Sequence, residues 1–243
     1  MSPALSLDVV VPVFNEERRL TACIETLHAF LQRQLPPGSW RIIIAENGST
    51  DRTAEVAEQL RARYLGVATF HRARPGRGEA LAHAWQQSKA EIVAYMDADL
   101  STDLEALPRL VALLQNGCDV AVGSRLMPGG VTIRSLKREF VSRAYNRLVR
   151  WLFRVPLTDT QCGFKAMRRA AIAPLLAQIQ NPRWFFDTEL LLTAHHHRLR
   201  ISEVPVRWSE NPDSRVKLPS TILQMAWGLI RLRCRFGLNR HCP

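Results

Sequence analysis

Residues 7–13 (LDVVVPV) form a continuous run of apolar, mostly β-branched side chains, the pattern of a strand buried on both faces of a parallel sheet. Between this run and the later ones, apolar positions are spaced by three and four residues, as on one face of a helix. The pattern predicts further strands at 41–46, 67–71, 91–96 and 119–124, and helices at about 20–35, 51–64, 76–89 and 103–115. This alternation predicts an α/β fold with a mostly parallel central sheet and helices on both faces.

Polar or small residues follow four of the predicted strands. They are the segments PVFNE, ENGSTD, DADLS and GSR. The carboxyl ends of parallel strands share one edge of a sheet, and ligands of α/β folds bind beyond that edge. We therefore expect these four segments to meet at a single site.

The alternation stops after about residue 130. A helix is expected at 135–153, basic on one side and aromatic or aliphatic on the other. Further elements are expected as a helix at 170–180, a loop and helix from Trp184, and a last strand in ISEVPVRW. The tail at 219–236 is again amphipathic. We predict one domain, residues 1–217, followed by a basic amphipathic C-terminal tail, residues 218–243.

No run reaches the roughly 18 uncharged apolar residues that span a bilayer, and the N-terminus lacks the pattern of a signal peptide. The five cysteines are scattered, without C-x-x-C spacing, which favours reduced thiols. These features predict a cytoplasmic protein.

The chain has 33 Lys and Arg against 22 Asp and Glu, a formal net charge of +11, with the excess concentrated in the second half. Such an excess suits nucleic acid, an anionic membrane surface or phosphorylated substrates. Nucleic acid is disfavoured, because the basic residues lie on amphipathic helices and the strand ends carry acids. A membrane surface and a phosphorylated substrate remain.

Asp97 and Asp99 follow the buried run at 91–96. An Asp-x-Asp at a strand end can present two carboxylates to a cation, and such oxygen ligands suit Mg²⁺ or Mn²⁺. The alternative is a solvated helix start, with Ser101, Thr102 and Asp103 as caps. No G-x-G-x-x-G or G-x-x-x-x-G-K-[ST] motif is present, which disfavours a dinucleotide site and a P-loop.

The ordered set PVFNEE (12–17), ENGSTDRT (46–53), GRG (76–78), MDADLS (96–101) and GSR (123–125) resembles the family 2 glycosyltransferases, which have the nucleotide-sugar-binding GT-A fold. The segments SRAYNRLVRWLF, DTQCGFKAMRR, WFFDTELL, EVPVRW and SRVKL are similar to polyprenyl-phosphate sugar transferases, most of all the dolichyl-phosphate β-glucosyltransferase branch.

The resemblance implies binding residues for a nucleotide sugar. They are Pro12, Phe14, Glu16, Glu46, Ser49, Arg77, Asp97, Ala98 and Arg215. Glu46 stands where the family usually has Asp, and Asn47 replaces a second Asp. Asp99 would be the main metal ligand, with Asp97 and Ser101 beside it. Ser101 stands where mannosyltransferase relatives carry Gln. The implied cofactor is Mg²⁺ or Mn²⁺.

The resemblance also implies a catalytic and acceptor-side group, namely Asp99, Arg125, Gln161, Lys165, Asp187 and Glu189. The implied reaction is inverting transfer of a sugar, glucose from UDP-glucose, to a polyprenyl or dolichyl phosphate. A phosphate with a second pKa near 6 is already nucleophilic at neutral pH, so Asp187 and Glu189 are expected to position groups more than to act as bases.

Two rival readings stay open. One is a GDP-mannose-dependent enzyme, and the other is a soluble family 2 transferase acting on a glycan hydroxyl. The leading reading places the protein peripherally at the cytosolic face of a membrane, held by the basic amphipathic segments at 135–153 and 219–236. A second copy of the chain is a further candidate partner.

Overall fold

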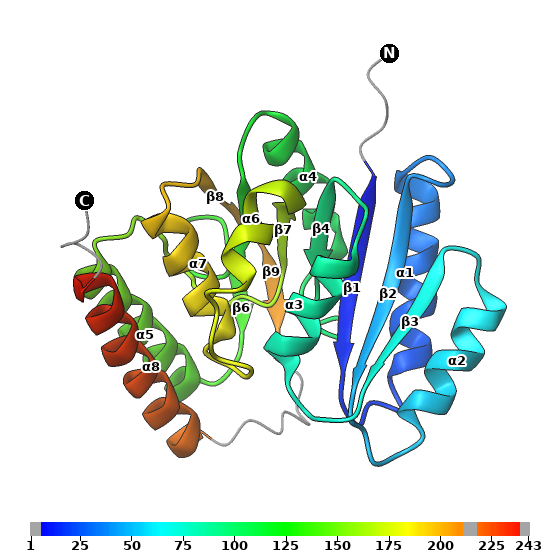
Figure 1. Ribbon diagram of the computed structural model, residues 1–243, viewed down its shortest axis with the longest axis horizontal. Coiled ribbons are helices and arrows are strands. Elements are labelled where there is room, and N and C mark those ends of the chain that lie inside the picture. The colour runs from blue at the N-terminus through cyan, green and yellow to red at the C-terminus, as the bar shows by residue number, and fades with distance from the viewer. Residues whose placement is uncertain (1–5, 211–217, 239–243) are drawn as a thin grey trace.

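A seven-stranded sheet forms the centre of the computed structural model, which describes residues 6–210 and 218–238 (Figure 1). The strand order is β3-β2-β1-β4-β7-β5-β8. The strands are β1 Leu7–Val13, β2 Trp40–Asn47, β3 Val67–Arg72, β4 Ile92–Tyr95, β5 Val120–Ser124, β7 Lys165–Arg168 and β8 Ile201–Pro205. The five strands predicted from the apolar runs are confirmed within one or two residues at each end.

All neighbouring strands are parallel except at β7, which runs antiparallel between β4 and β5. The sequence pattern did not predict β7, because its four residues (KAMR) are too short to show a period. Two further strands, β6 Val131–Ile133 and β9 Arg207–Ser209, form a small parallel sheet beyond the end of β5. The mostly parallel α/β fold is confirmed.

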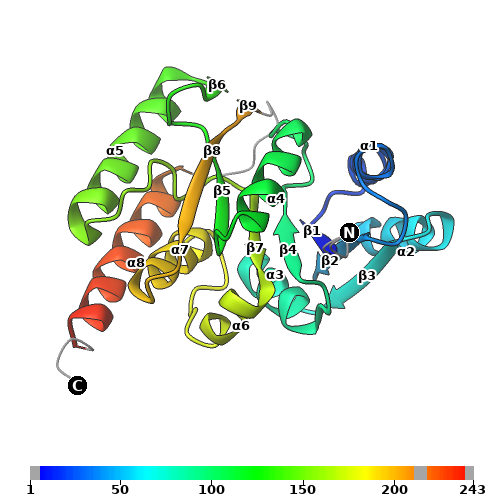
Figure 2. The ribbon, with the colours of Figure 1, turned by 90° about the horizontal axis from the view of Figure 1, so that it is seen from above.

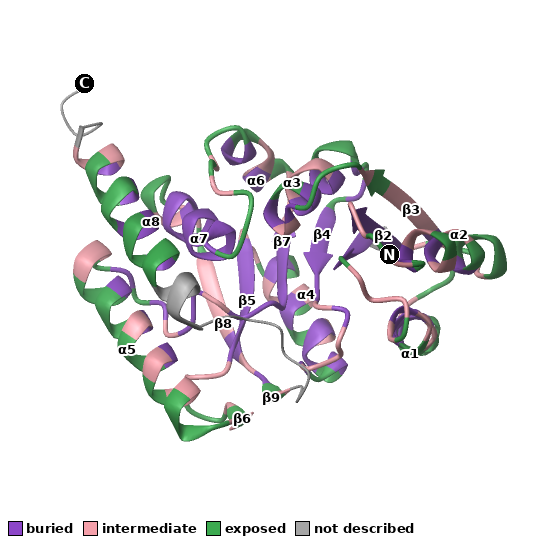
Figure 3. Cartoon of the chain, turned by 90° about the horizontal axis from the view of Figure 1, so that it is seen from below, coloured by how far each residue is buried: buried purple, intermediate pink, exposed green. Residues whose placement is uncertain are grey.

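Side chains of β1 alternate between two cores. Val9, Val11 and Val13 pack with α1 Leu20–Gln34, α2 Thr53–Arg63 and α4 Leu107–Gln115 on one face. Val10 packs on the other face, in the core formed with α3 Arg77–Gln87, α6 Arg169–Leu176 and α7 Phe186–His196. Figure 2 shows these two layers from above, and Figure 3 shows the buried strands between them. Each face is therefore covered by helices, as the alternation predicted.

Two expected helices differ in detail from the structure. The segment expected at 103–115 begins as a 3₁₀ turn, η1 Leu104–Ala106, with the Asp103 carboxylate accepting the Glu105 N–H. Asp103 is therefore a helix-start residue. The helix expected at 170–180 ends at Leu176, ahead of a loop that contains Asn181 and Pro182.

Helices α5 Leu136–Phe153 and α8 Leu218–Leu238 lie side by side along one flank of the molecule (Figures 1 and 2). One face of α8 carries Met225, Leu229, Leu232 and Phe236 into the second core. Part of the apolar stripe that the sequence suggested for a membrane is thus used for packing. The proposed boundary at residue 217 borders the stretch 211–217, which lies outside the described residues. Across the ranges 6–210 and 218–238, no helix is long and apolar enough to cross a membrane.

Candidate functional site

The carboxyl ends of β1, β2, β4 and β5 face the same edge of the sheet, since the pairings make these four strands mutually parallel. Their following loops begin at residues 14, 48, 96 and 125. The gathering of the four polar strand ends predicted from the sequence is confirmed. This edge holds the candidate site.

The loops after β1 and β2 are tied to each other by hydrogen bonds. The backbone N–H of Asn15 donates to Ser49 Oγ at 3.0 Å, and the Asn15 side chain accepts the Thr50 N–H at 2.8 Å. The Glu16 N–H donates to Thr53 Oγ1 at 2.8 Å. Asn15 adopts a left-handed backbone (φ 55°), which Asn tolerates better than most residues. Phe14, in the loop after β1, is 40% exposed, so its ring can stack on a planar ligand.

Glu46 is buried at the end of β2. Its carboxylate accepts the Ser49 N–H at 2.5 Å and lies 3.4 Å from His71 Nδ1. His71 also contacts Glu58 through Nε2 at 2.9 Å. Hydrogen bonds from Thr69, His71 and Arg61 lower the pKa of Glu58 to about 2. The position of Glu46 is therefore set by Ser49 in the loop after β2 and by His71 in β3.

Asn47 has a structural reason to be an amide. Its Nδ2 donates to the Val13 carbonyl at 2.7 Å, while its Oδ1 accepts the Gly76 N–H at 3.1 Å. A carboxylate could accept the second bond but not donate the first. The amide thus joins β1, β2 and the start of α3.

Asp97 and Asp99 lie on the loop that follows β4. Asp97 Oδ1 accepts a hydrogen bond from Arg77 Nη2 at 2.7 Å, and its side chain is 37% exposed. Asp99 Oδ1 accepts the Ser101 N–H at 3.0 Å. Ala98 between them is buried in the first core. Both acids are therefore presented at the site edge, and Ser101 orients Asp99 through its backbone.

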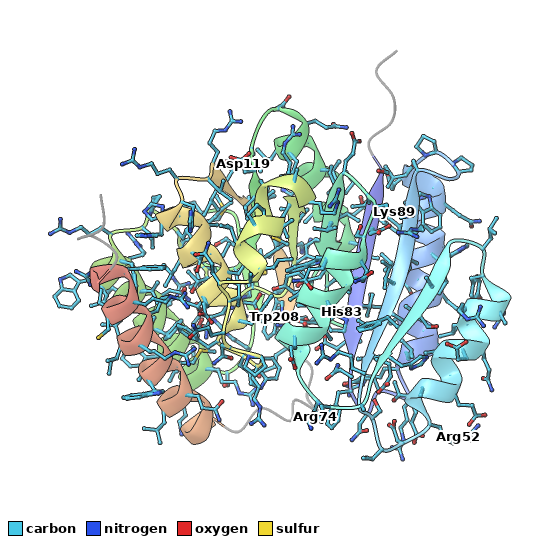
Figure 4. The ribbon with its side chains drawn as sticks, in the orientation of Figure 1. Arg52, Arg74, His83, Lys89, Asp119 and Trp208 are labelled. Carbon is cyan, nitrogen blue, oxygen red and sulfur yellow. The ribbon has the colours of Figure 1, made fainter. Side chains whose placement is uncertain are left out.

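The second sheet holds this loop from outside. Ser209 N–H donates to the Ser101 carbonyl at 2.9 Å, and Asp103 N–H donates to the Arg207 carbonyl at 3.0 Å. Trp208, labelled in Figure 4, lies between these two residues of β9. Its ring centre is 5.4 Å from the Arg125 guanidinium and 5.8 Å from the Arg134 guanidinium. The loop that carries the acids is thus braced by β9.

The two acids fit a divalent cation that takes part of its coordination from a ligand. Among the described residues no group of three or more His, Cys, Asp and Glu side chains is arranged to hold a metal. Mg²⁺ and Mn²⁺ suit carboxylate and phosphate oxygens, and Mg²⁺ commonly uses one or two carboxylates with substrate phosphates and water. Asp99 and Asp97 are the donors that match this chemistry.

Behind Asp97 lies a buried group of charges. Arg77, the first residue of α3, donates to Asp187 Oδ2 on α7 at 2.6 Å. Asp187 Oδ1 accepts from Lys165 Nζ at 2.7 Å and from the Tyr95 hydroxyl. Burial raises the pKa of Asp187, against the opposing effect of Arg77. Burial also lowers the pKa of Lys165 to about 7.

Arg125, after β5, is held by Asp159. Its Nε and Nη2 donate to the two carboxylate oxygens at 2.6 and 3.0 Å, and its backbone N–H donates at 3.1 Å. The Gln161 N–H adds a fourth bond at 3.1 Å. Burial alone would raise the pKa of Asp159, but the charge and hydrogen bonds of Arg125 lower it below its usual value. The orientation of the Arg125 side chain is thus fixed by its ion pair with Asp159.

The structure brings some of the sequence-predicted residues together and separates others. Arg77, Asp97, Lys165 and Asp187 form one contact chain. Glu189 faces away from it, accepting the Asn181 N–H at 2.8 Å and pairing with Arg235 of α8 at 3.0 Å. Arg215 lies outside the described residues.

Three residues of this region were missed by sequence reasoning. Tyr95 reads as one apolar residue near the end of a buried strand, and Asp159 as a loop acid. Gly163 lies against Asp97, where a Cβ would overlap the carboxylate. A polar hydroxyl at the end of an apolar run was the one signal that could have identified Tyr95.

Comparison with known proteins matches most of the chain to one family. The model of the family described as Glycosyl transferase family 2 matches residues 8–176. Glycosyltransferase AglD of Haloferax volcanii is 38% identical over 93% of this chain, which spans 37% of that protein's length. The human dolichyl-phosphate β-glucosyltransferase is 32% identical over 97% of this chain and 77% of that protein. The corresponding Drosophila melanogaster protein is 33% identical over 97% of this chain and 76% of its own length.

Solved structures share the fold. Glucosyl-3-phosphoglycerate synthase from Mycobacterium tuberculosis, in complex with Mn²⁺, UDP-glucose and phosphoglyceric acid, has a TM-score of 0.68 at 20% identity, covering 94% of this chain and 80% of that one. TarS 1–349 from S. aureus has a TM-score of 0.66 at 18% identity, covering 98% and 67%.

Proposed function

Because the chain belongs to glycosyl transferase family 2, we propose that it transfers glucose from UDP-glucose to the phosphate of a polyprenyl lipid at the cytosolic face of a membrane. The names of its relatives support this choice of donor sugar and acceptor, since several are dolichyl-phosphate β-glucosyltransferases. The residue arrangement supports it on chemical grounds.

The observation that carries the proposal is the pair of acids beyond β4, backed by Arg77 and flanked by the β1 and β2 loops. A uridine would lie by Phe14 and Glu46, and the diphosphate beside Asp97 and Asp99. Asp99, with Asp97 and Ser101 nearby, would hold Mg²⁺ or Mn²⁺. The bound cation would supply charge that stabilises the departing diphosphate. Arg77, already fixed between two carboxylates, adds a preorganised positive charge to the same region.

The state of the buried acids favours a phosphate nucleophile. A sugar hydroxyl needs a free base, but Asp187 accepts bonds from Arg77, Lys165 and Tyr95, and Glu189 faces α8. A lipid phosphate is largely dianionic at neutral pH and needs no base. Its direct attack at the anomeric carbon, as UDP leaves from the opposite side, inverts that centre and gives a β-linked glucose.

The outer face of α5 supports a membrane surface as partner. This helix buries Ser142, Asn146 and Val149. The Asn146 side-chain oxygen accepts a hydrogen bond from the Thr160 N–H at 2.9 Å. Tyr145, Leu152 and Phe153 pack against the second core. Four other apolar side chains of α5 are exposed: Leu136, Phe140, Leu148 and Trp151. A helix that buries polar residues and exposes aromatic ones is arranged for a second apolar environment.

The neighbouring α8 continues this surface. Leu223, Trp227 and Ile230 are exposed on the side away from its packed stripe. Exposed basic residues flank both helices, namely Lys137, Arg143, Arg147, Arg150, Arg154, Arg231 and Arg233. Each cation near an anionic leaflet contributes about 1 kcal/mol. The mixture of aromatic and basic groups favours a lipid surface over a protein partner, and it would hold the enzyme where its acceptor resides.

The test is a donor and acceptor panel. Purified protein with Mn²⁺ would receive labelled UDP-glucose or GDP-mannose together with either a short polyprenyl phosphate or a free glycan. We expect label to enter the organic phase only with UDP-glucose and the lipid phosphate. Transfer from GDP-mannose would overturn the donor, and transfer to the glycan would overturn the acceptor.

A further inference from the structure

Tyr95 and Lys165 stand directly opposite each other on the antiparallel strands β4 and β7. Lys165 Nζ donates to the Tyr95 hydroxyl at 2.9 Å, and also to the carbonyl of Cys162. Both side chains are fully buried, on the face of the sheet that α3 and α7 cover. Neither is open to a substrate, so any part they take in the reaction passes through another residue.

Asp187 is that next residue. Its Oδ1 is shared by Tyr95 and Lys165, and its Oδ2 accepts from Arg77 Nη1. Three donors from β4, β7 and α3 therefore fix one carboxylate on α7. A carboxylate held on both oxygens cannot rotate without losing a buried bond, and each such loss is costly.

Arg77 connects the fixed Asp187 carboxylate to Asp97. Its Nη1 is held by Asp187 and its Nη2 by Asp97, while its guanidinium lies 5.2 Å from the centre of the Tyr95 ring. Side-chain exposure rises from 0% at Lys165 and 4% at Asp187 to 15% at Arg77 and 37% at Asp97. The chain of contacts runs from the interior to the acid that faces the substrate.

We propose that Tyr95 and Lys165 are positioning residues for the transfer reaction, which through Asp187 hold the Arg77 guanidinium against Asp97. This assignment rests on the proposed function. It differs from the sequence expectation that Lys165 serves the acceptor. Lys165 and Tyr95 are the inner donors to Asp187, and both are fully buried. Without its inner anchors, Asp187 would no longer give Arg77 a fixed partner.

The decisive variant is Tyr95→Phe, which removes one hydroxyl and keeps the ring. Tyr145→Phe is its matched control, because Tyr145 is half-buried and its hydroxyl donates to Thr188 of α7 at 3.0 Å, not to the Asp187 carboxylate. Loss of a buried hydrogen bond to a charged group predicts that Tyr95→Phe lowers kcat/KM for the donor about 10-fold or more. Tyr145→Phe should lower the unfolding temperature with kcat/KM unchanged. Equal effects of the two variants on kcat/KM would overturn the proposal.

A double-mutant cycle separates positioning from general loosening of the core. In an Arg77→Gln background, Tyr95→Phe should cost less than about 2-fold in further kcat/KM, because the residue through which it acts is gone. If the losses of kcat/KM caused by Tyr95→Phe and Arg77→Gln multiplied in the double variant, the proposal would be overturned.

Calorimetric titration with UDP and Mn²⁺ gives a readout that needs no turnover. We expect Tyr95→Phe to weaken binding about 10-fold and Tyr145→Phe to leave it unchanged. If the wild type bound UDP but transferred no glucose to a polyprenyl phosphate, the proposed function would fail while this comparison still tested the positioning role. Unchanged binding in Tyr95→Phe would contradict that role.

Discussion

The Cα of Gly163 lies against the carboxylate of Asp97, and a Cβ built on Gly163 would overlap Asp97 Oδ2. The contact joins the segment before β7 to the loop after β4. Asp97 is thereby confined between Gly163 on one side and Arg77, 2.7 Å away, on the other. The position of Asp97 therefore depends on the absence of a Cβ at Gly163 as well as on the ion pair with Arg77.

We predict that Gly163→Ala displaces Asp97 and breaks its contact with Arg77. Misplacement of a site group by about 1 Å can cost about 100-fold in rate, so kcat/KM for UDP-glucose should fall by that order. Gly237→Ala is the control, because nothing lies within 4 Å of a Cβ at Gly237. Steady-state kinetics of both variants decide the point, and a fully active Gly163→Ala would contradict this account of Asp97.

The two acids of α7 should separate in their effects. Asp187→Asn is expected to lower transfer about 10-fold or more, because its amide cannot accept from all three donors. Glu189→Gln should instead lower the unfolding temperature, since it weakens the tie from α7 to Arg235 of α8. Both variants are measured by kinetics with a short-chain acceptor and by thermal unfolding. If Glu189→Gln lost turnover while its unfolding temperature stayed that of the wild type, Glu189 would have a direct role in the reaction.

The Arg125–Asp159 pair predicts a pH-dependent part of stability. The folded-state pKa of Asp159 lies below its usual value of 3.8, so its contribution is complete above that value and is lost as the pH falls through the folded-state pKa. Asp159→Asn leaves Arg125 buried without its partner and should lower the free energy of unfolding by about 3 kcal/mol at pH 7. The difference from the wild type should shrink below about pH 4 in urea titrations. A difference that stays constant would show that the charge of Asp159 is irrelevant.

The flank formed by α5 and α8 predicts binding to lipid. Trp227→Ala removes one exposed aromatic side chain and should weaken sedimentation with anionic vesicles about 10-fold. Leu65→Ala is the control, because Leu65 is exposed at the far turn between α2 and β3. Replacing the anionic lipid by a neutral one should also weaken binding of the wild type. Equal binding of Trp227→Ala and wild type would refute this surface.

Local patterns were enough to predict the strand ends. The runs before Val13, Asn47, Tyr95 and Ser124 are each apolar and short, and parallel strands place their ends together whatever the loops do. Asp103 as a helix-start residue also follows from local sequence, because its carboxylate serves a backbone N–H two residues later.

The contact chain behind Asp97 could not be predicted in this way. Arg77 and Asp187 are 110 residues apart, and they meet only because α3 and α7 cover the same face of the sheet. The inner anchor Lys165 belongs to β7, whose four residues carry no readable period. The separation of Glu189 from Asp187, however, was within reach of sequence reasoning. Two helical residues spaced by two positions point roughly 200° apart.

The role of Asp99 in sugar transfer is measured by comparing Asp99→Asn with Asp103→Asn. Both change one acid in the same short segment, but Asp99 faces the site and Asp103 caps η1. With UDP-glucose, Mn²⁺ and a short polyprenyl phosphate, we expect β-linked glucosyl lipid from the wild type and Asp103→Asn, and loss of nearly all transfer in Asp99→Asn. Full activity in Asp99→Asn, or an α-linked product from the wild type, would contradict this expectation.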